Sequence, residues 1–147
     1  MARTIIGIIV GYVAMFVLVS ITFMGMFLLM GTDWSFKPGS FEASNGWIAM
    51  ALVAYFIIGV VGGLICALIA RSDKAILGLI IVVFVLGLLL AIPSVISHRT
   101  NAGRVRTGNV TQTEAMQYAT EPLWVPFTFP VIGAIGVLIG GKLKKRS

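Results

Sequence analysis

The chain has 147 residues, of which 59% are hydrophobic and only 11% are charged. Soluble domains carry about 25% charged residues, so this composition excludes an ordinary soluble fold. The net charge of +6 does not indicate nucleic-acid binding, because the basic residues stand at the ends of long apolar runs. In that position they orient a protein in a membrane and attract anionic headgroups. We therefore expect an integral membrane protein that contacts the lipid bilayer and binds no nucleic acid.

Four apolar runs are long enough to cross a bilayer as helices, since the hydrocarbon core requires about 20 residues. They cover residues 5–30, 47–70, 75–97 and 122–141, and none contains a charged residue or histidine. Only residues 71–74 join the second and third runs, so we expect an antiparallel hairpin with its helices side by side. The predicted fold is all-α, a polytopic membrane protein with one domain over residues 1–147. Its four transmembrane helices form an antiparallel bundle.

The first run is too long for the apolar core of a signal peptide, and no Ala-x-Ala cleavage pattern follows it, so we expect it to be a retained helix. The outer loops are predicted at residues 31–46 and 98–121. In the second loop, Thr111 and Glu114 have the spacing of a capping box, which predicts a short helix over residues 112–120. Asn109 begins a tripeptide of the N-glycosylation type, a pattern that is also common by chance.

The distribution of positive charge predicts the orientation. Seven of the 11 Lys and Arg residues lie at the end that holds both termini and residues 71–74. By the positive-inside rule, both termini are therefore cytoplasmic, and we expect a location in the bacterial inner membrane. The tryptophans lie at the opposite ends of the predicted spans, where indole rings favour the headgroup level. They are Trp34, Trp47 and Trp124.

Small residues spaced four apart allow membrane helices to approach closely. The second and fourth runs carry several, and the predicted packing residues are Gly59, Gly62, Gly63, Ala67, Gly136 and Gly140. Aromatic and Met side chains fill the outer halves of the runs instead. We expect a bundle that is tight at its cytoplasmic side and splayed at its outer side. Small-residue rows on more than one face indicate more packing surface than a monomer needs.

The start of the fourth run has a proline every four residues, at Pro122, Pro126 and Pro130. Each proline ring removes one amide and clashes with the carbonyl four residues earlier, except in the first turn of a helix. We expect the outer segment of this span to be bent or partly unwound.

The residues needed for several kinds of chemistry are missing. Ion-coupled transport normally requires an ionisable group inside a span, a haem bundle requires axial histidines, and disulfide exchange requires a cysteine pair. The chain has a single histidine, His98, at the edge of a span, and a single cysteine, Cys66, in a row of small residues. We predict no catalytic, cofactor or metal site, and no enzymatic activity.

Three segments suggest a family resemblance. They are Ile8-Ile9-Val10-Gly11-Tyr12-Val13, the stretch from Gly62 through Ala70 to Arg71, and Glu114-Ala115-Met116-Gln117. In these segments the chain resembles a class of small four-span bacterial membrane proteins. The resemblance implies no particular activity.

Two functional hypotheses follow from the sequence. The first is a structural or accessory subunit that packs against a membrane-protein partner or a second copy through its small-residue rows. The alternative is a binder or carrier of a lipophilic molecule, a lipid or quinone, in the outer half of the bundle. In that case guanidinium groups suit an acidic headgroup. The candidate headgroup contacts are Arg99, Arg104 and Arg106.

Overall fold

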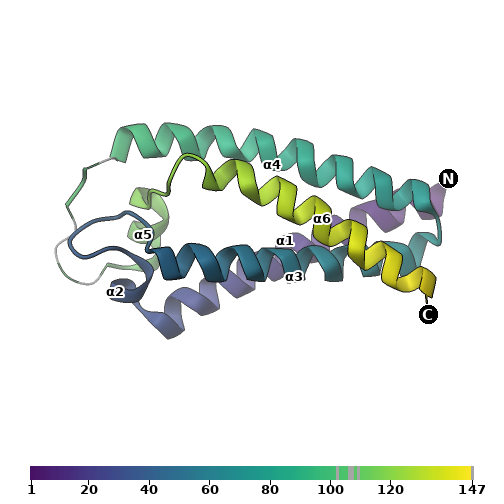
Figure 1. The fold of residues 1–147 in the computed structure, drawn as a ribbon, viewed down its shortest axis with the longest axis horizontal. Helices are drawn as coiled ribbons and strands as arrows, with labels where there is room; N and C mark the ends of the chain where they lie inside the picture. Colours follow the sequence, from purple (N-terminus) through teal and green to yellow (C-terminus); the bar gives the residue numbers. More distant parts are fainter. Residues whose placement is uncertain (102, 106–107, 109, 147) are drawn as a thin grey trace.

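The computed structural model describes residues 1–101, 103–105, 108 and 110–146. In this part of the chain the regular structure is helical, and four helices are long and apolar enough to cross a membrane (Figure 1). The predicted all-α fold with four apolar helices is confirmed. The helices are α1 (Ala2–Met30), α2 (Thr32–Ser35), α3 (Asn45–Ala70), α4 (Asp73–Asn101), α5 (Gln112–Tyr118) and α6 (Val125–Arg146).

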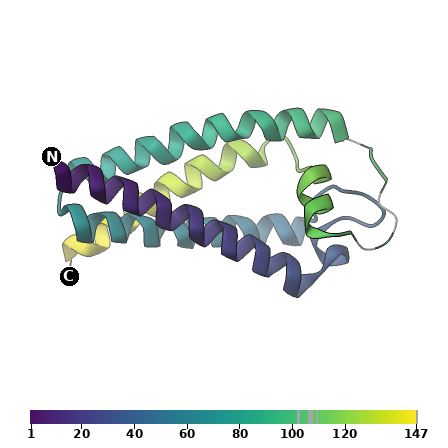
Figure 2. The same ribbon diagram turned by 180° about the vertical axis from the view of Figure 1, so that it is seen from behind.

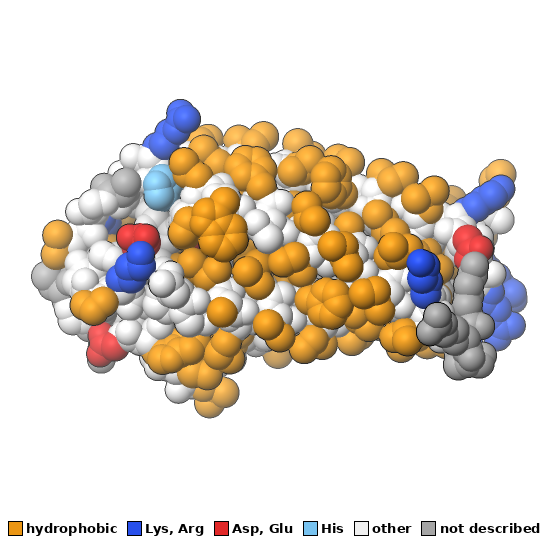
Figure 3. All heavy atoms as spheres, in the orientation of Figure 1, with side chains coloured by type: hydrophobic (Ala, Val, Ile, Leu, Met, Phe, Trp, Pro, Cys, Tyr) orange, Lys and Arg blue, Asp and Glu red, His pale blue; other side chains and the backbone are white. Residues whose placement is uncertain are grey.

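The surface of the bundle fits a membrane environment. Figure 3 shows hydrophobic side chains over the middle of one face, with charged side chains gathered at the two ends. Leu28 and Leu29, which are 68% and 88% exposed, are not covered by the rest of the protein. Such exposure is favourable in lipid and unfavourable in water. The structure is that of an integral membrane protein.

Both termini lie at one end of the bundle, which we call the termini end (Figure 1). The other end carries α2, α5 and the two long loops, and we call it the capped end. The predicted cytoplasmic side corresponds to the termini end, and the predicted outer side corresponds to the capped end.

Helices that are neighbours in the sequence are not the closest neighbours in space. α6 packs extensively against α3 and α4, and α1 packs mainly against α3. Both ribbon views show α6 between α3 and α4 (Figures 1 and 2). Arg71, with a left-handed φ of 52°, ends α3 and turns the chain back. The hairpin is antiparallel, but its predicted side-by-side packing is wrong over most of its length, because α6 occupies the space between the two helices.

The contact between α3 and α6 is a contact between backbones. A Cβ atom added at Gly59 would lie 2.9 Å from the carbonyl oxygen of Gly133. Gly63 faces the backbone of Val137 in the same way, and Gly140 faces a carbonyl of α3. Cβ atoms do not normally approach other heavy atoms this closely. The glycines are therefore what allow α6 to reach its position.

α3 carries two rows of small residues, and the row that begins at Gly62 and ends at Ala70 faces α1. Gly62 lies against the side chain of Met15, and a Cβ atom at Gly7 would lie 2.7 Å from the Cβ atom of Ala70. Ala67, which continues the row of Gly59 and Gly63, is buried in the core cluster that contains Met15 and Ala70. Helices of the same chain thus cover both rows. These rows, from which a further packing partner was expected, are therefore occupied by α1 and α6.

We predict that Gly63→Ala destabilises the bundle, because the new methyl group meets the backbone of Val137. The expected loss is about 1–3 kcal/mol of unfolding free energy, the usual cost of overpacking. Thermal unfolding in detergent micelles measures it. Gly25→Ala is the matched control, since nothing lies within 4 Å of the added Cβ at this position. Equal stability of the two variants would contradict the backbone contact.

α6 begins three residues later than the predicted span of residues 122–141. The helix begins at Val125, whose amide donates a hydrogen bond of 3.0 Å to the carbonyl oxygen of Pro122 in the preceding turn. Pro126 therefore lies in the first turn, where its missing amide has no cost, and Pro130 is the proline inside the helix. The predicted unwinding is limited to the residues before Val125. The helix regains its length by continuing to Arg146.

The two long loops pair with each other and form an ordered cap. The amide of Ala43 donates to the carbonyl oxygen of Thr120 at 2.7 Å, and the amide of Thr120 donates to that of Phe41 at 2.8 Å. Phe36, Phe41 and Ala115 form a small buried cluster beneath these bonds. The two segments were predicted only as separate outer loops. Their pairing is a feature that only the structure shows.

The predicted short helix of the second loop is confirmed as α5, with Tyr118 as its last residue. Its capping box is formed as expected. The amide of Glu114 donates to the Thr111 hydroxyl at 3.3 Å, and the Thr111 amide donates to the Glu114 carboxylate at 3.4 Å. Asn109, which begins the glycosylation tripeptide, lies outside the described residues.

Candidate functional site

α1 and α4 approach each other near the termini end and separate toward the capped end (Figure 2). Near the termini end, Gly78 of α4 faces Ile8 of α1, and Gly11 of α1 faces Leu79 of α4. Toward the capped end α1 carries aromatic and Met side chains, and Gly25 has no neighbour within 4 Å of an added Cβ atom. The predicted taper, tight at the termini end and splayed at the capped end, is confirmed for this helix pair.

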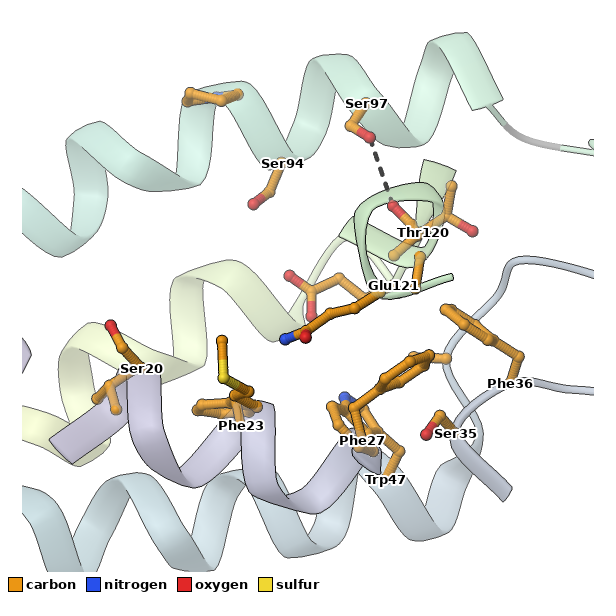
Figure 4. Close-up of a pocket in the computed structure, with 17 residues that line it drawn as sticks. Ser20, Phe23, Phe27, Ser35, Phe36, Trp47, Ser94, Ser97, Thr120 and Glu121 are labelled. Atoms are coloured by element: carbon orange, nitrogen blue, oxygen red, sulfur yellow. Dashed lines mark hydrogen bonds between the residues drawn. The ribbon is translucent and has the colours of Figure 1, made fainter. Parts of the chain in front are cut away.

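The space between the two helices at the capped end is a cavity of about 630 Å³. This volume falls within the range of about 300–1,000 Å³ that is usual for small-molecule sites. α1 and α4 form its two sides, and the cap closes its outer end (Figure 4). Ser20, Met24 and Pro93 line the cavity and are also exposed on the surface of the bundle. The cavity therefore opens sideways, toward the lipid.

Aromatic rings form much of the wall. The rings of Phe23 and Trp47 have centroids 6.1 Å apart, and those of Phe27 and Phe36 are 6.5 Å apart. These separations are typical of stabilising edge-to-face and tilted pairs. The ring of Phe23 also packs against that of Phe129 of α6, with the two centroids 6.5 Å apart. Rings from α1, α3, α6 and the first loop thus support one another and hold the apolar wall in place.

A short segment before α6 brings polar groups into the cavity. The Ser97 hydroxyl of α4 donates to the carbonyl oxygen of Ala119 at 3.4 Å (Figure 4), and the backbone of Thr120 is bonded to the first loop. These bonds attach residues 119 and 120 to α4 on one side and to the first loop on the other. They thereby position the next residue, Glu121. Glu121 lines the main cavity and also a neighbouring cavity of about 200 Å³.

The Glu121 carboxylate has no balancing charge. Within the described residues it forms no hydrogen bond and no ion pair, and the described lining of both cavities contains no Lys or Arg. Burial raises the pKa of the Glu121 carboxyl above its ordinary value, because the ionised form loses hydration.

A raised pKa means that the folded protein binds this proton more tightly than the unfolded chain. The favourable contribution of Glu121 to folding is complete below the unfolded pKa, and it falls as the pH rises through the folded pKa. We predict that Glu121→Gln raises the unfolding temperature at about pH 8 and changes it little at about pH 4. Thermal unfolding in detergent at both pH values is the measurement.

Glu42→Gln is the control for removal of one negative charge. Glu42 lies in the cap and forms an ion pair of 2.7 Å with Lys37, so its replacement should give no gain at about pH 8. A gain of similar size in both variants would show that net charge, rather than the burial of Glu121, determines the effect.

Of the arginines predicted to contact a headgroup, the two that the structure describes do not line the cavity. Arg99 is exposed at the end of α4. The guanidinium of Arg104 lies 4.2 Å from the ring centroid of Tyr118, on the surface of the cap. Arg106 lies outside the described residues. The predicted glycine and alanine positions lie in helix contacts and not at the cavity. Five of them are described above, and a Cβ atom added at the sixth, Gly136, would lie 2.6 Å from the carbonyl oxygen of Phe56 on α3.

Glu121 was not predicted as a site residue, because it stands one position before the apolar run of residues 122–141 and was therefore assigned to the loop. The sequence feature that could have indicated it is its position directly next to that apolar run, with no polar residue between them. The pairing that positions it, between Thr120 and the first loop, has no local pattern in the sequence.

His98 belongs to the last turn of α4 and does not line either cavity. Its Nδ1 atom is buried without a hydrogen-bond partner. In the described part of the chain, no three His, Cys, Asp or Glu residues lie together as metal ligands would.

Comparisons with protein-family models, with curated proteins and with solved structures give no match. The cavity is therefore the feature of this protein that indicates a function.

Proposed function

We propose that this protein binds a lipophilic molecule taken from the bilayer, in the cavity between α1 and α4. The observation that supports this most strongly is the cavity itself, about 630 Å³ in volume, walled by aromatic rings and open to lipid at one side. Apolar pockets with a few convergent polar groups are typical of small-molecule sites.

The source of the affinity follows from the position of the opening. Ser20 and Met24 stand at the mouth on a helix that faces lipid, so a ligand can enter without crossing water. Moving an apolar chain from lipid into protein has no hydrophobic driving force, because lipid tails are as apolar as the wall. Binding must then come from close packing on rings such as Phe23 and from the polar groups near Glu121.

The accessory-subunit hypothesis stays a prediction with less support. It rested on rows of small residues available to other proteins, and α1 and α6 of the same chain cover these rows. A partner would have to bind another part of the apolar surface. The cavity, in contrast, is a specific feature that a purely structural bundle does not require.

We predict that protein extracted gently from its own membrane carries a stoichiometric small-molecule adduct in native mass spectrometry. Val19→Trp should remove the adduct, because Val19 lines both cavities and an indole ring there fills the binding space. Val17→Trp is the matched control, since Val17 lies on the same helix, is 46% exposed and lines neither cavity.

Thermal unfolding of both variants checks that the bundle still folds. A folded Val19→Trp variant that keeps the full adduct would contradict binding in the cavity. A larger complex with a second protein, and no small-molecule adduct, would favour the subunit hypothesis instead.

We further propose that the termini end faces the cytoplasm and that the protein lies in a bacterial inner membrane. Most of the basic residues, including Lys142, belong to that end, as the positive-inside rule requires. The cap, with its paired loops, then faces the outer side.

A cysteine-labelling experiment tests this orientation. Pro38→Cys, at an exposed position in the cap, should react with a membrane-impermeant maleimide in intact cells. Ser72→Cys, in the link between α3 and α4, should react only after the cells are permeabilised. The unaltered protein gives the background, because Cys66 is buried. The reverse pattern would show the opposite orientation.

A further inference from the structure

The charge at the cavity narrows the class of ligand. Glu121 is the one acidic or basic side chain among the described residues that line the two cavities. A negative headgroup placed beside it would be repelled, and repulsion is strong where water is scarce. The lining therefore disfavours fatty acids and acidic phospholipids, in contrast to the acidic headgroup expected beside the arginines.

A positively charged headgroup would balance the negative charge of the Glu121 carboxylate. This carboxylate has no partner within the described residues, and a partly buried, unpaired charge is unfavourable. The raised pKa of this carboxyl is the expected sign of that cost. A cation beside the carboxylate would remove the penalty and would gain a charge-assisted hydrogen bond.

The aromatic rings near this position favour the same chemistry. Phe23 lines both cavities together with Glu121. Its ring contacts Trp47 and Phe129, and Phe129 contacts Tyr55 with a centroid separation of 5.1 Å. Ring faces attract cations, and groups of aromatic rings recognise ammonium ions in many proteins. A carboxylate and several rings that line the same cavities thus form a suitable site for an ammonium group.

We propose that the ligand is an amphiphile with an ammonium headgroup, which Glu121 and the rings around Phe23 bind where the two cavities meet. This inference rests on the proposed function. The hydroxyl of Ser94, which also lines both cavities, can accept a further hydrogen bond from the ammonium group. The hydrocarbon chain extends through the main cavity toward Met24 and the opening to lipid.

Three probes with the same dodecyl chain test the headgroup: a primary amine, an alcohol and a carboxylate. Native mass spectrometry in an uncharged alkyl-glycoside detergent compares their binding to the unaltered protein and to Glu121→Gln. The unaltered protein should prefer the amine over the alcohol by about tenfold or more, as expected for a hydrogen bond to a charged group. Glu121→Gln should lose this preference and should still bind the alcohol.

The outcomes separate this inference from the proposed function. If Glu121→Gln keeps the preference for the amine, or if the unaltered protein prefers the alcohol or the carboxylate, the ammonium assignment is overturned while cavity binding stands. If none of the probes binds, and Val19→Trp has no effect on any native adduct, the proposed function itself fails. Glu42→Gln, in the cap but outside both cavities, should behave as the unaltered protein.

Two sources supply the same chemistry, namely a free long-chain amine and the ethanolamine headgroup of a bilayer lipid. Titration with phosphatidylethanolamine and with phosphatidylglycerol, in the same detergent, distinguishes them. Binding of the ethanolamine lipid that depends on Glu121 identifies a bilayer lipid as the source. Binding of the single-chain amine alone identifies a free amine.

Discussion

The direct contact between the backbones of α3 and α6 is the constraint on which the rest of the structure depends. Gly59 and Gly63 of α3 meet Gly133 and Val137 of α6 with no side chain between them. In a bilayer, where lipid is as apolar as the protein interior, such close packing is a main source of helix association. It places α6 in the centre, against both α3 and α4, and α1 is left to pack on the other face of α3.

The cavity is a result of this arrangement. α1 is held close to its neighbours near Gly7 and Gly11, whereas its other half has large side chains and diverges from α4. The paired loops then close the outer end, and the bond between Thr120 and the first loop brings Glu121 to the edge of the apolar space. Packing at one end and loop pairing at the other thus create a sheltered, aromatic and negatively charged site between them.

Much of the fold was predictable because its signals are local. Uncharged runs of about 20 residues have the length of helices that cross a bilayer. The Thr111 and Glu114 spacing is complete within four residues, and the glycine spacing shows which faces pack. A glycine row does not reveal its partner, however, so the central position of α6 was missed. The cavity combines residues of five helices, α1 to α5, and of both loops, which are distant in the sequence. The position of Glu121 depends on a pairing between two loops, for which neither loop carries a local pattern.

The central position of α6 has a consequence for biogenesis. Among the four long helices α6 is synthesised after the other three, yet it makes the most extensive contact with α3 and also packs against α4. Until it enters the membrane, the glycine face of α3 that includes Gly63 has only lipid to contact, and α4 has no central neighbour. The bundle therefore assembles around its latest helix rather than growing outward from its first. A chain that lacks α6 would keep the contact of α1 with α3, but it would leave the glycine face of α3 exposed to lipid.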